Sequence, residues 1–138
     1  MSELNSKPFV WPVRVYFEDT DAGGVVYHSR YLNFFERART EMCCARGLSM
    51  TELKRDHNLI WVVLDINARF RQAAKLDDEL LVTAEVNWIK GVRQRFRQQM
   101  TRKEDGVLIA TAELSAVMLH ADTLKPARMP AWIRAELD

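Results

Sequence analysis

The hydrophobic pattern of this chain switches to a period of two near residue 59, and that switch limits the folds available to it. From residue 59 to residue 120, four long segments alternate apolar and polar side chains, as strands with one buried face do. Gly91 and the pair Asp105-Gly106 supply tight turns between them, so neighbouring strands are expected to be antiparallel. The predicted strands are Leu59–Phe70, Glu79–Lys90, Val92–Glu104 and Val107–His120.

Each predicted strand carries one apolar face. The faces are expected to hold Val62, Leu64, Ile66, Ala68 and Phe70; Leu80, Val82, Ala84, Val86 and Trp88; Val92, Phe96 and Met100; and Leu108, Ala110, Ala112, Leu114, Ala116 and Met118.

Before these strands the apolar residues recur every three or four positions, which predicts one long helix from about Val26 to Arg46. Gly47 is a suitable terminator. Ser49 and Glu52 have capping-box spacing, so a second, short helix is expected to run to about His57. The apolar stripe of the long helix comprises Tyr31, Phe34, Phe35, Ala38, Met42 and Ala45.

A short strand, Val13–Phe17, is expected before the long helix, and a short helix, about Pro130–Leu137, at the end of the chain. The long helix can bury its stripe only against one face of the sheet. We therefore predict an α+β fold, a single domain over residues 1–138 with a central helix wrapped by a curved antiparallel sheet. One helix cannot cover every strand, so a homodimer is expected.

Several classes of function are disfavoured by composition. The chain has 20 basic and 19 acidic residues, and this balance gives no general attraction to nucleic acid or anionic membranes. Cys43 and Cys44 are adjacent and cannot form an intrachain disulfide framework, which fits a reducing cytoplasm. We find neither a signal peptide nor a transmembrane segment. The three histidines lack metal-ligand spacing, so no metal or other cofactor is expected.

Two carboxylates, Asp19 and Asp21, lie in a glycine-containing loop that leads into the long helix. The first N–H groups of a helix have no internal partner and can polarise a carbonyl. A carboxylate beside such donors is the pair that acyl transfer needs. An aspartate before a helix is, however, more commonly a cap or a turn former, and Asp19 fits that role.

The segment VRVYFEDTDAGGVVYHSRYLNFFERARTE resembles the signature of the hotdog-fold thioesterases of the 4-hydroxybenzoyl-CoA thioesterase type. More narrowly, it is similar to the bacterial acyl-CoA thioesterases associated with the Tol-Pal system. The predicted element order is the hotdog order, so the resemblance covers nearly the whole chain. The motif is met at Tyr16, Asp19, Asp21, Gly24, Val26, Tyr27, His28 and Tyr31.

This resemblance implies an acyl-CoA thioesterase with Asp21 as the catalytic carboxylate and the backbone amide at His28 as the carbonyl-polarising donor. Gly24, Val26 and Tyr27 are then expected to contact the substrate. Asp21 could attack the carbonyl to give a mixed anhydride, or act as a general base on water. The histidine at position 28 favours a short aliphatic acyl group over 4-hydroxybenzoyl.

Coenzyme A also needs cationic contacts for its phosphates. The densest basic group surrounds the Gly91 turn, and Lys90 and Arg93 are the candidates there. Arg95 and Arg97 share the polar face of the same predicted strand, and for Arg97 a solvated surface position is the simpler interpretation.

Two other functions are compatible with the pattern. A hotdog hydratase or dehydratase would act on acyl thioesters, although the Asp-x-Asp-x-x-Gly loop argues against it. A non-catalytic partner of an acyl carrier protein or of the Tol-Pal machinery belongs to a different class, and such a role can coexist with hydrolysis. The resemblance also implies a homodimer or homotetramer, in the cytoplasm or peripheral to the inner membrane, with the acyl group presented by coenzyme A or by acyl carrier protein.

Overall fold

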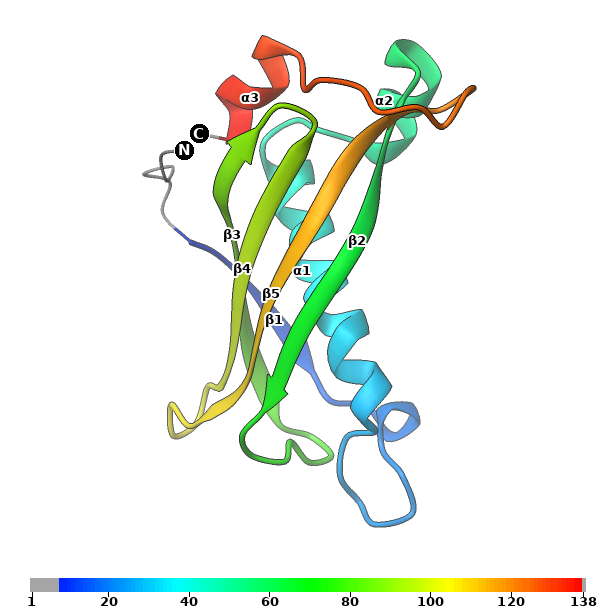
Figure 1. Ribbon diagram of the computed structural model, residues 1–138. Helices are drawn as coiled ribbons and strands as arrows, with labels where there is room; N and C mark the ends of the chain where they lie inside the picture. The colour runs from blue at the N-terminus through cyan, green and yellow to red at the C-terminus, as the bar shows by residue number, and fades with distance from the viewer. Residues whose placement is uncertain (1–7, 138) are drawn as a thin grey trace.

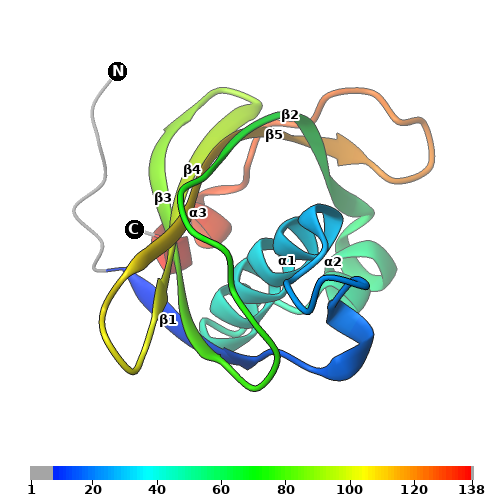
Figure 2. The same cartoon turned by 90° about the horizontal axis from the view of Figure 1, so that it is seen from below.

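The computed structural model describes residues 8–137, in which a curved antiparallel sheet wraps one long helix (Figures 1 and 2). The predicted α+β architecture is confirmed. Residues 1–7 and 138 of the predicted domain lie outside the described residues. The elements are β1 (Phe9–Arg14), a 3₁₀ turn η1 (Phe17–Asp19), α1 (His28–Ala45), α2 (Met50–His57), β2 (Leu59–Phe70), β3 (Glu79–Lys90), β4 (Arg93–Arg102), β5 (Leu108–His120) and α3 (Ala131–Leu137).

The local signals for the two helices are confirmed. α1 begins and ends within two residues of its predicted bounds. α2 follows Ser49, whose hydroxyl oxygen accepts a hydrogen bond from the N–H of Glu52 at 3.3 Å. Within residues 8–137, no helix is both long and apolar enough to cross a membrane.

The five strands have the order β1-β3-β4-β5-β2, and every neighbouring pair is antiparallel. The turn between β3 and β4 contains Gly91 at φ 60°, a conformation that glycine adopts without strain. β1 and β2 are the two edges of the sheet. Because β2 is an edge strand, its outer row of backbone groups has no partner strand within the described chain.

The first strand lies earlier than predicted. We expected Val13–Phe17, but β1 spans Phe9–Arg14. The residues that follow turn away because the carboxylate of Asp19 accepts a 2.9 Å hydrogen bond from the N–H of Tyr16 and closes η1. Pro12 is tolerated in β1 because an edge strand can lose one N–H donor.

A bulge in β2 divides its predicted apolar face. The pairing with β5 shifts between Val63 and Asp65, leaving Leu64 as the extra residue. Val62 therefore lies on the opposite face of the sheet from Ile66, and the prediction that they share a face is wrong. Beyond the bulge, Ile66 and Phe70 face the helix as expected.

A second bulge, in β3, removes Trp88 from the face predicted for it. Val86 pairs with Phe96, but Trp88 pairs with Arg95, the residue before Phe96. Since adjacent residues of a strand point to opposite faces, Trp88 lies on the convex face with Arg95. Ile89 is the buried residue at this end of β3.

The apolar stripe of α1 forms the centre of the core. Phe34, Phe35, Ala38 and Met42 are fully buried, and Tyr31 nearly so. Ala45, which was predicted to close the stripe, is exposed in the last turn of α1, and Cys43 is buried there instead.

Candidate active site

The loop between η1 and α1 is closed on itself by backbone hydrogen bonds. The N–H of Asp21 donates to the carbonyl of Val25 at 2.9 Å, and the N–H of Gly24 donates to the carbonyl of Asp21 at 3.1 Å. Gly24 has φ 79°, a left-handed conformation that residues other than glycine rarely adopt. Thr20 and Val26 form an isolated bridge across the base of the loop. The segment that carries Asp21 is therefore held against the segment that leads into α1.

The same loop is attached to the rest of the molecule through the connection between β2 and β3. Val26 donates its N–H to the carbonyl of Ala74 at 2.8 Å, and Val25 forms a bridge with Lys75. The side chain of Val26 is buried in the core. Val26 therefore anchors the loop, and its predicted contact with substrate would come from its backbone.

The Asp21 carboxylate is exposed and constrained on one side. The N–H of Gly23 donates to Oδ1 of Asp21 at 2.8 Å. A Cβ at position 23 would lie 3.3 Å from that oxygen, so glycine there leaves room for the carboxylate. Among residues 8–137, no ion pair is formed by Asp21, so its second oxygen is available to a substrate or to water.

Asp19 has the structural role that the sequence predicted. Only 2% of it is exposed. Its carboxylate accepts the N–H of Tyr16, and Oδ1 lies 3.5 Å from Nε of Arg30. Its carbonyl accepts the N–H of Tyr27 at 2.9 Å, which ties the start of the loop to the residue before α1. Asp19 is thus committed to holding the loop.

The N-terminus of α1 carries free donor capacity. His28 is the first residue of the helix, and the preceding residue, Tyr27, makes no side-chain capping hydrogen bond. The first N–H groups of a helix lack intrahelical acceptors and carry partial positive charge. The rings of Tyr27 and His28 are both exposed and lie 4.5 Å apart. The amide at position 28 is therefore placed at the end of the loop that presents Asp21.

The two cations predicted to bind phosphate lie elsewhere in the single chain. Lys90 and Arg93 flank the exposed turn between β3 and β4, at the opposite end of the sheet from the loop that carries Asp21 (Figure 1). One chain does not bring these three residues together. The neighbouring Arg95 and Arg97 are paired with Glu113 at 3.0 Å and Glu85 at 2.8 Å respectively.

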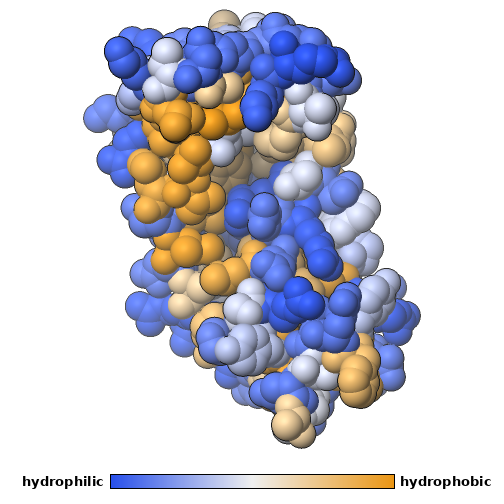
Figure 3. Space-filling model, turned by 90° about the vertical axis from the view of Figure 1, so that its right-hand side faces the viewer, coloured by the Kyte–Doolittle hydropathy of each residue, from blue (hydrophilic) through white to orange (hydrophobic). Residues whose placement is uncertain are grey.

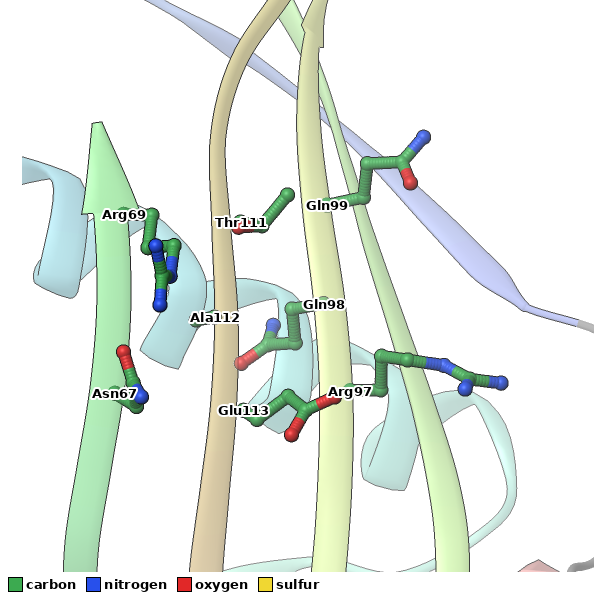
Figure 4. Close-up of a pocket in the computed structure, with 8 residues that line it drawn as sticks. All are labelled: Asn67, Arg69, Arg97, Gln98, Gln99, Thr111, Ala112 and Glu113. Carbon is green, nitrogen blue, oxygen red and sulfur yellow. The ribbon is translucent and has the colours of Figure 1, made fainter. Parts of the chain in front are cut away.

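A polar hollow of about 400 Å³ lies across β2, β4 and β5 (Figure 4). Two cations, Arg69 and Arg97, and one anion, Glu113, line it. It is on the face of the sheet turned away from α1, which separates it from His28. The polar side chains around it are Asn67, Arg69, Arg97, Gln99, Thr111 and Glu113.

On the opposite, concave face the helix leaves part of the sheet uncovered. α1 packs mainly against β3 and β1. Along β2, Val63, Ile66 and Phe70 face the helix but remain 45%, 38% and 50% exposed. These side chains form a groove beside α1, and Figure 3 shows hydrophobic surface gathered next to a hollow on this side of the molecule.

At the α2 end of this groove is a pocket of about 210 Å³ between α1 and the sheet. Its walls are mostly apolar, and they include one cation, Arg39, and one carboxylate, Glu36. The sequence analysis identified neither residue as part of a site. The lining residues are Glu36, Arg39, Thr40, Cys43, Met50, Trp61, Val63, Phe96, Leu114 and Ala116.

A buried amide that was not predicted from the sequence joins α1 to the sheet. Gln98 is 1% exposed, and its Nε2 donates to the carbonyls of Phe35 in α1 and Thr83 in β3 at 2.9 and 3.1 Å. Its Oε1 accepts from Nη1 of Arg39 at 2.9 Å. Gln98 alternates along β4 with Phe96 and Met100 and lies on the same face of the sheet. That position was the signal in the sequence that could have identified Gln98.

No metal centre is evident in the described part of the chain, where no group of three or more His, Cys, Asp and Glu side chains comes together. Burial raises the pKa of Cys43 to about 11, so this thiol is protonated at neutral pH and is not an activated nucleophile.

The sequence and the fold both match known proteins. The family model described as the thioesterase-like superfamily matches residues 15–137. "Acyl-CoA thioesterase YbgC" of Haemophilus influenzae is 41% identical over 127 residues, which are 92% of each chain. A probable thioesterase from Bartonella henselae has a TM-score of 0.84 at 31% identity, over 90% of this chain and 100% of that one.

A more distant structure supports the fold alone. The 1,4-dihydroxy-2-naphthoyl-CoA thioesterase Slr0204 from Synechocystis has a TM-score of 0.88 at 22% identity, over 95% of this chain and 96% of that one.

Proposed function

Because the chain belongs to the thioesterase-like superfamily, we propose that it hydrolyses acyl-CoA to a free acid and coenzyme A through Asp21 and the N-terminus of α1. The observation that carries this assignment is the closed loop that presents an exposed carboxylate beside an uncapped helix N-terminus. The thioester carbonyl oxygen would accept a hydrogen bond from the amide of His28. A donor of this kind contributes about 3–4 kcal/mol in the transition state.

Asp21 then acts on the carbonyl carbon in one of two ways. As a nucleophile it would form a mixed anhydride and expel the thiolate, and water would release the acid. As a general base it would take a proton from a water molecule that attacks the carbon. Its free oxygen allows either. In a single turnover in isotopically labelled water, label in the Asp21 side chain identifies direct attack, whereas label found only in the acid identifies water attack.

The loop residues have separate parts in this proposal. Gly24 lets the backbone approach the thioester because glycine has no side chain. Glycine also adopts the left-handed conformation of this position without strain. Tyr27 and His28 present their exposed rings to the pantetheine arm. Val26 positions the loop through the core.

A homodimer formed through β2 would complete the site. The unpaired edge and the exposed apolar side chains of β2 suit antiparallel pairing with β2 of a second copy. A two-fold axis at that edge would run the two sheets in opposite directions, so that each end of one sheet lies beside the other end of its partner. It would bring Lys90 and Arg93 of the partner subunit to the end that carries Asp21, where they would bind the phosphates of coenzyme A.

The experiment that tests the function is thiol release from a panel of acyl-CoA substrates, with the same acyl groups on acyl carrier protein. Hydrolysis that depends on the acyl group supports the proposal. No thiol release from any substrate contradicts it and favours a binding role. The cytoplasmic location, the Tol-Pal association, the short aliphatic acyl group and the choice between dimer and tetramer remain predictions of the resemblance.

A further inference from the structure

Arg39 differs in its partner from three arginines of β4. Arg95, Arg97 and Arg102 each pair with a carboxylate at 3.0, 2.8 and 2.9 Å. Arg39 is partly buried, and its side-chain hydrogen bond within residues 8–137 is to the neutral Oε1 of Gln98. Gln98 is a neutral partner, and Glu36, which lines the same pocket, acts on Arg39 only through a longer-range electrostatic interaction, so the guanidinium keeps N–H donors for an anionic ligand.

The surroundings of Arg39 define where that anion would lie. Its guanidinium lines the 210 Å³ pocket, whose walls include Trp61, Phe96 and Leu114. Burial lowers the pKa of Arg39, although the group stays charged at neutral pH. A guanidinium has five N–H donors, and Gln98 engages one of its nitrogens. The remaining donors fit a carboxylate, which a guanidinium can bind in a bidentate manner.

Exposed apolar side chains of β2 lie between this pocket and the thioester site. Arg39 lies three turns along α1 from His28, about 16 Å at a rise of about 1.5 Å per residue. The rings of Phe70 and Tyr31 make a tilted contact at the His28 end, with centroids 5.2 Å apart, and Ile66 and Val63 continue the apolar surface toward the pocket. Long helical side chains lean toward the helix N-terminus, so the guanidinium lies nearer to His28 than its Cα does.

We infer that the groove takes an acyl chain of medium length that ends in a carboxylate, and that Arg39 binds this carboxylate. The substrate class would be dicarboxylic acyl-CoA. This inference rests on the proposed function, and it differs from the short aliphatic group favoured by the sequence, because a short chain would end before Arg39. Glu36 also lines the pocket, and its negative charge lies on the same helix face one turn before Arg39, where it opposes the binding.

The test compares acyl-CoA substrates of equal length that differ only in the far end. Hydrolysis of suberoyl-CoA and octanoyl-CoA is measured as kcat/KM for the wild-type protein and for Arg39→Met. The ratio of suberoyl to octanoyl hydrolysis should fall about tenfold to a hundredfold in the variant, which is the range for a hydrogen bond to a charged group. Arg37→Met, which removes an exposed arginine outside this pocket, should leave the ratio unchanged.

An unchanged ratio in Arg39→Met overturns the inference, because a purely structural role would reduce both activities together. Glu36→Gln provides a second measurement if Arg39→Met does not fold. It should raise the ratio, and an unchanged ratio there also overturns the inference. If neither substrate is hydrolysed by the wild type but other acyl-CoAs are, this substrate class is wrong and the proposed function stands. No hydrolysis of any thioester would contradict the proposed function itself.

Discussion

Oδ1 of Asp21 accepts a 2.8 Å hydrogen bond from the N–H of Gly23, and this contact fixes the orientation of a carboxylate that is otherwise open to solvent. Two residues earlier, the carboxylate of Asp19 is buried and engaged by Tyr16 and Arg30. The two acidic residues therefore have different roles: Asp19 holds the loop, and Asp21 is available for chemistry. This division leads to opposite expectations for their substitution.

Asp19→Ala should destabilise the protein. The change removes the acceptor for the N–H of Tyr16 and leaves Arg30 without its buried partner. The free energy of unfolding should fall by about 2–3 kcal/mol, as measured by urea denaturation. Glu18→Ala, at the neighbouring exposed position, should change it by less than about 0.5 kcal/mol. Equal, small effects of the two changes would mean that Asp19 does not hold the loop.

Ile66→Lys should separate the proposed dimer. The residue is 38% exposed on β2, and an inward-facing lysine on an edge strand opposes pairing with a second sheet. Analytical ultracentrifugation should show a shift toward the monomer. Leu124→Lys, at an exposed position in the segment before α3, should leave the oligomer intact. A wild-type protein that sediments as a monomer would contradict this part of the proposal.

Substituting Lys90 and Arg93 with glutamate should raise KM for acyl-CoA more than it lowers kcat. Contacts with the nucleotide phosphates are equally strong in the ground state and the transition state, so their loss weakens binding. Steady-state kinetics on the double variant measures both constants, with Lys54→Glu on α2 as the control. A fall in kcat with an unchanged KM would place the phosphates elsewhere.

Cys43 should make stability depend on pH above neutrality. Its pKa is raised to about 11 by burial, and by Cys44 to a smaller extent, from an ordinary value of 9.0. The folded state therefore keeps the proton longer than the unfolded state, so this contribution is complete below about pH 9 and is lost as pH rises from about 9 to 11. The loss amounts to about 2–3 kcal/mol.

Urea denaturation of the wild type and of Cys43→Ala as a function of pH isolates this contribution. The difference in the free energy of unfolding between the two proteins should be constant below about pH 9. Above about pH 9 the wild type should lose stability relative to Cys43→Ala. A difference that does not vary with pH would mean that the thiol is not desolvated in the folded state.

The sequence predicted those parts of the fold that depend on local patterns. The period-two segments gave the bounds of β2 and β3 directly, and Ser49 with Glu52 located the start of α2. The β-bulges at Leu64 and near Trp88 were missed, because a bulge adds a residue without changing the local composition.

The candidate site was predicted only where its residues are contiguous. Asp21 and His28 belong to one loop, so the motif located both. Arg39 and Gln98 come together across 59 positions. Alternation with Phe96 and Met100 marked the face of Gln98, whereas Arg39 has no local signal that separates it from a surface residue. The distance along the sheet between the Asp21 loop and Lys90 likewise depends on strand order, which the sequence pattern does not specify.

The most direct test of the account is the hydrolysis of acyl-CoA by Asp21→Asn. Asparagine retains an oxygen that can accept the N–H of Gly23, so the loop geometry should persist. The account predicts that kcat falls about 10²–10⁴-fold, with the thermal midpoint close to that of the wild type. A folded Asp21→Asn protein that releases thiol at close to the wild-type rate would contradict the assignment of the chemistry to Asp21.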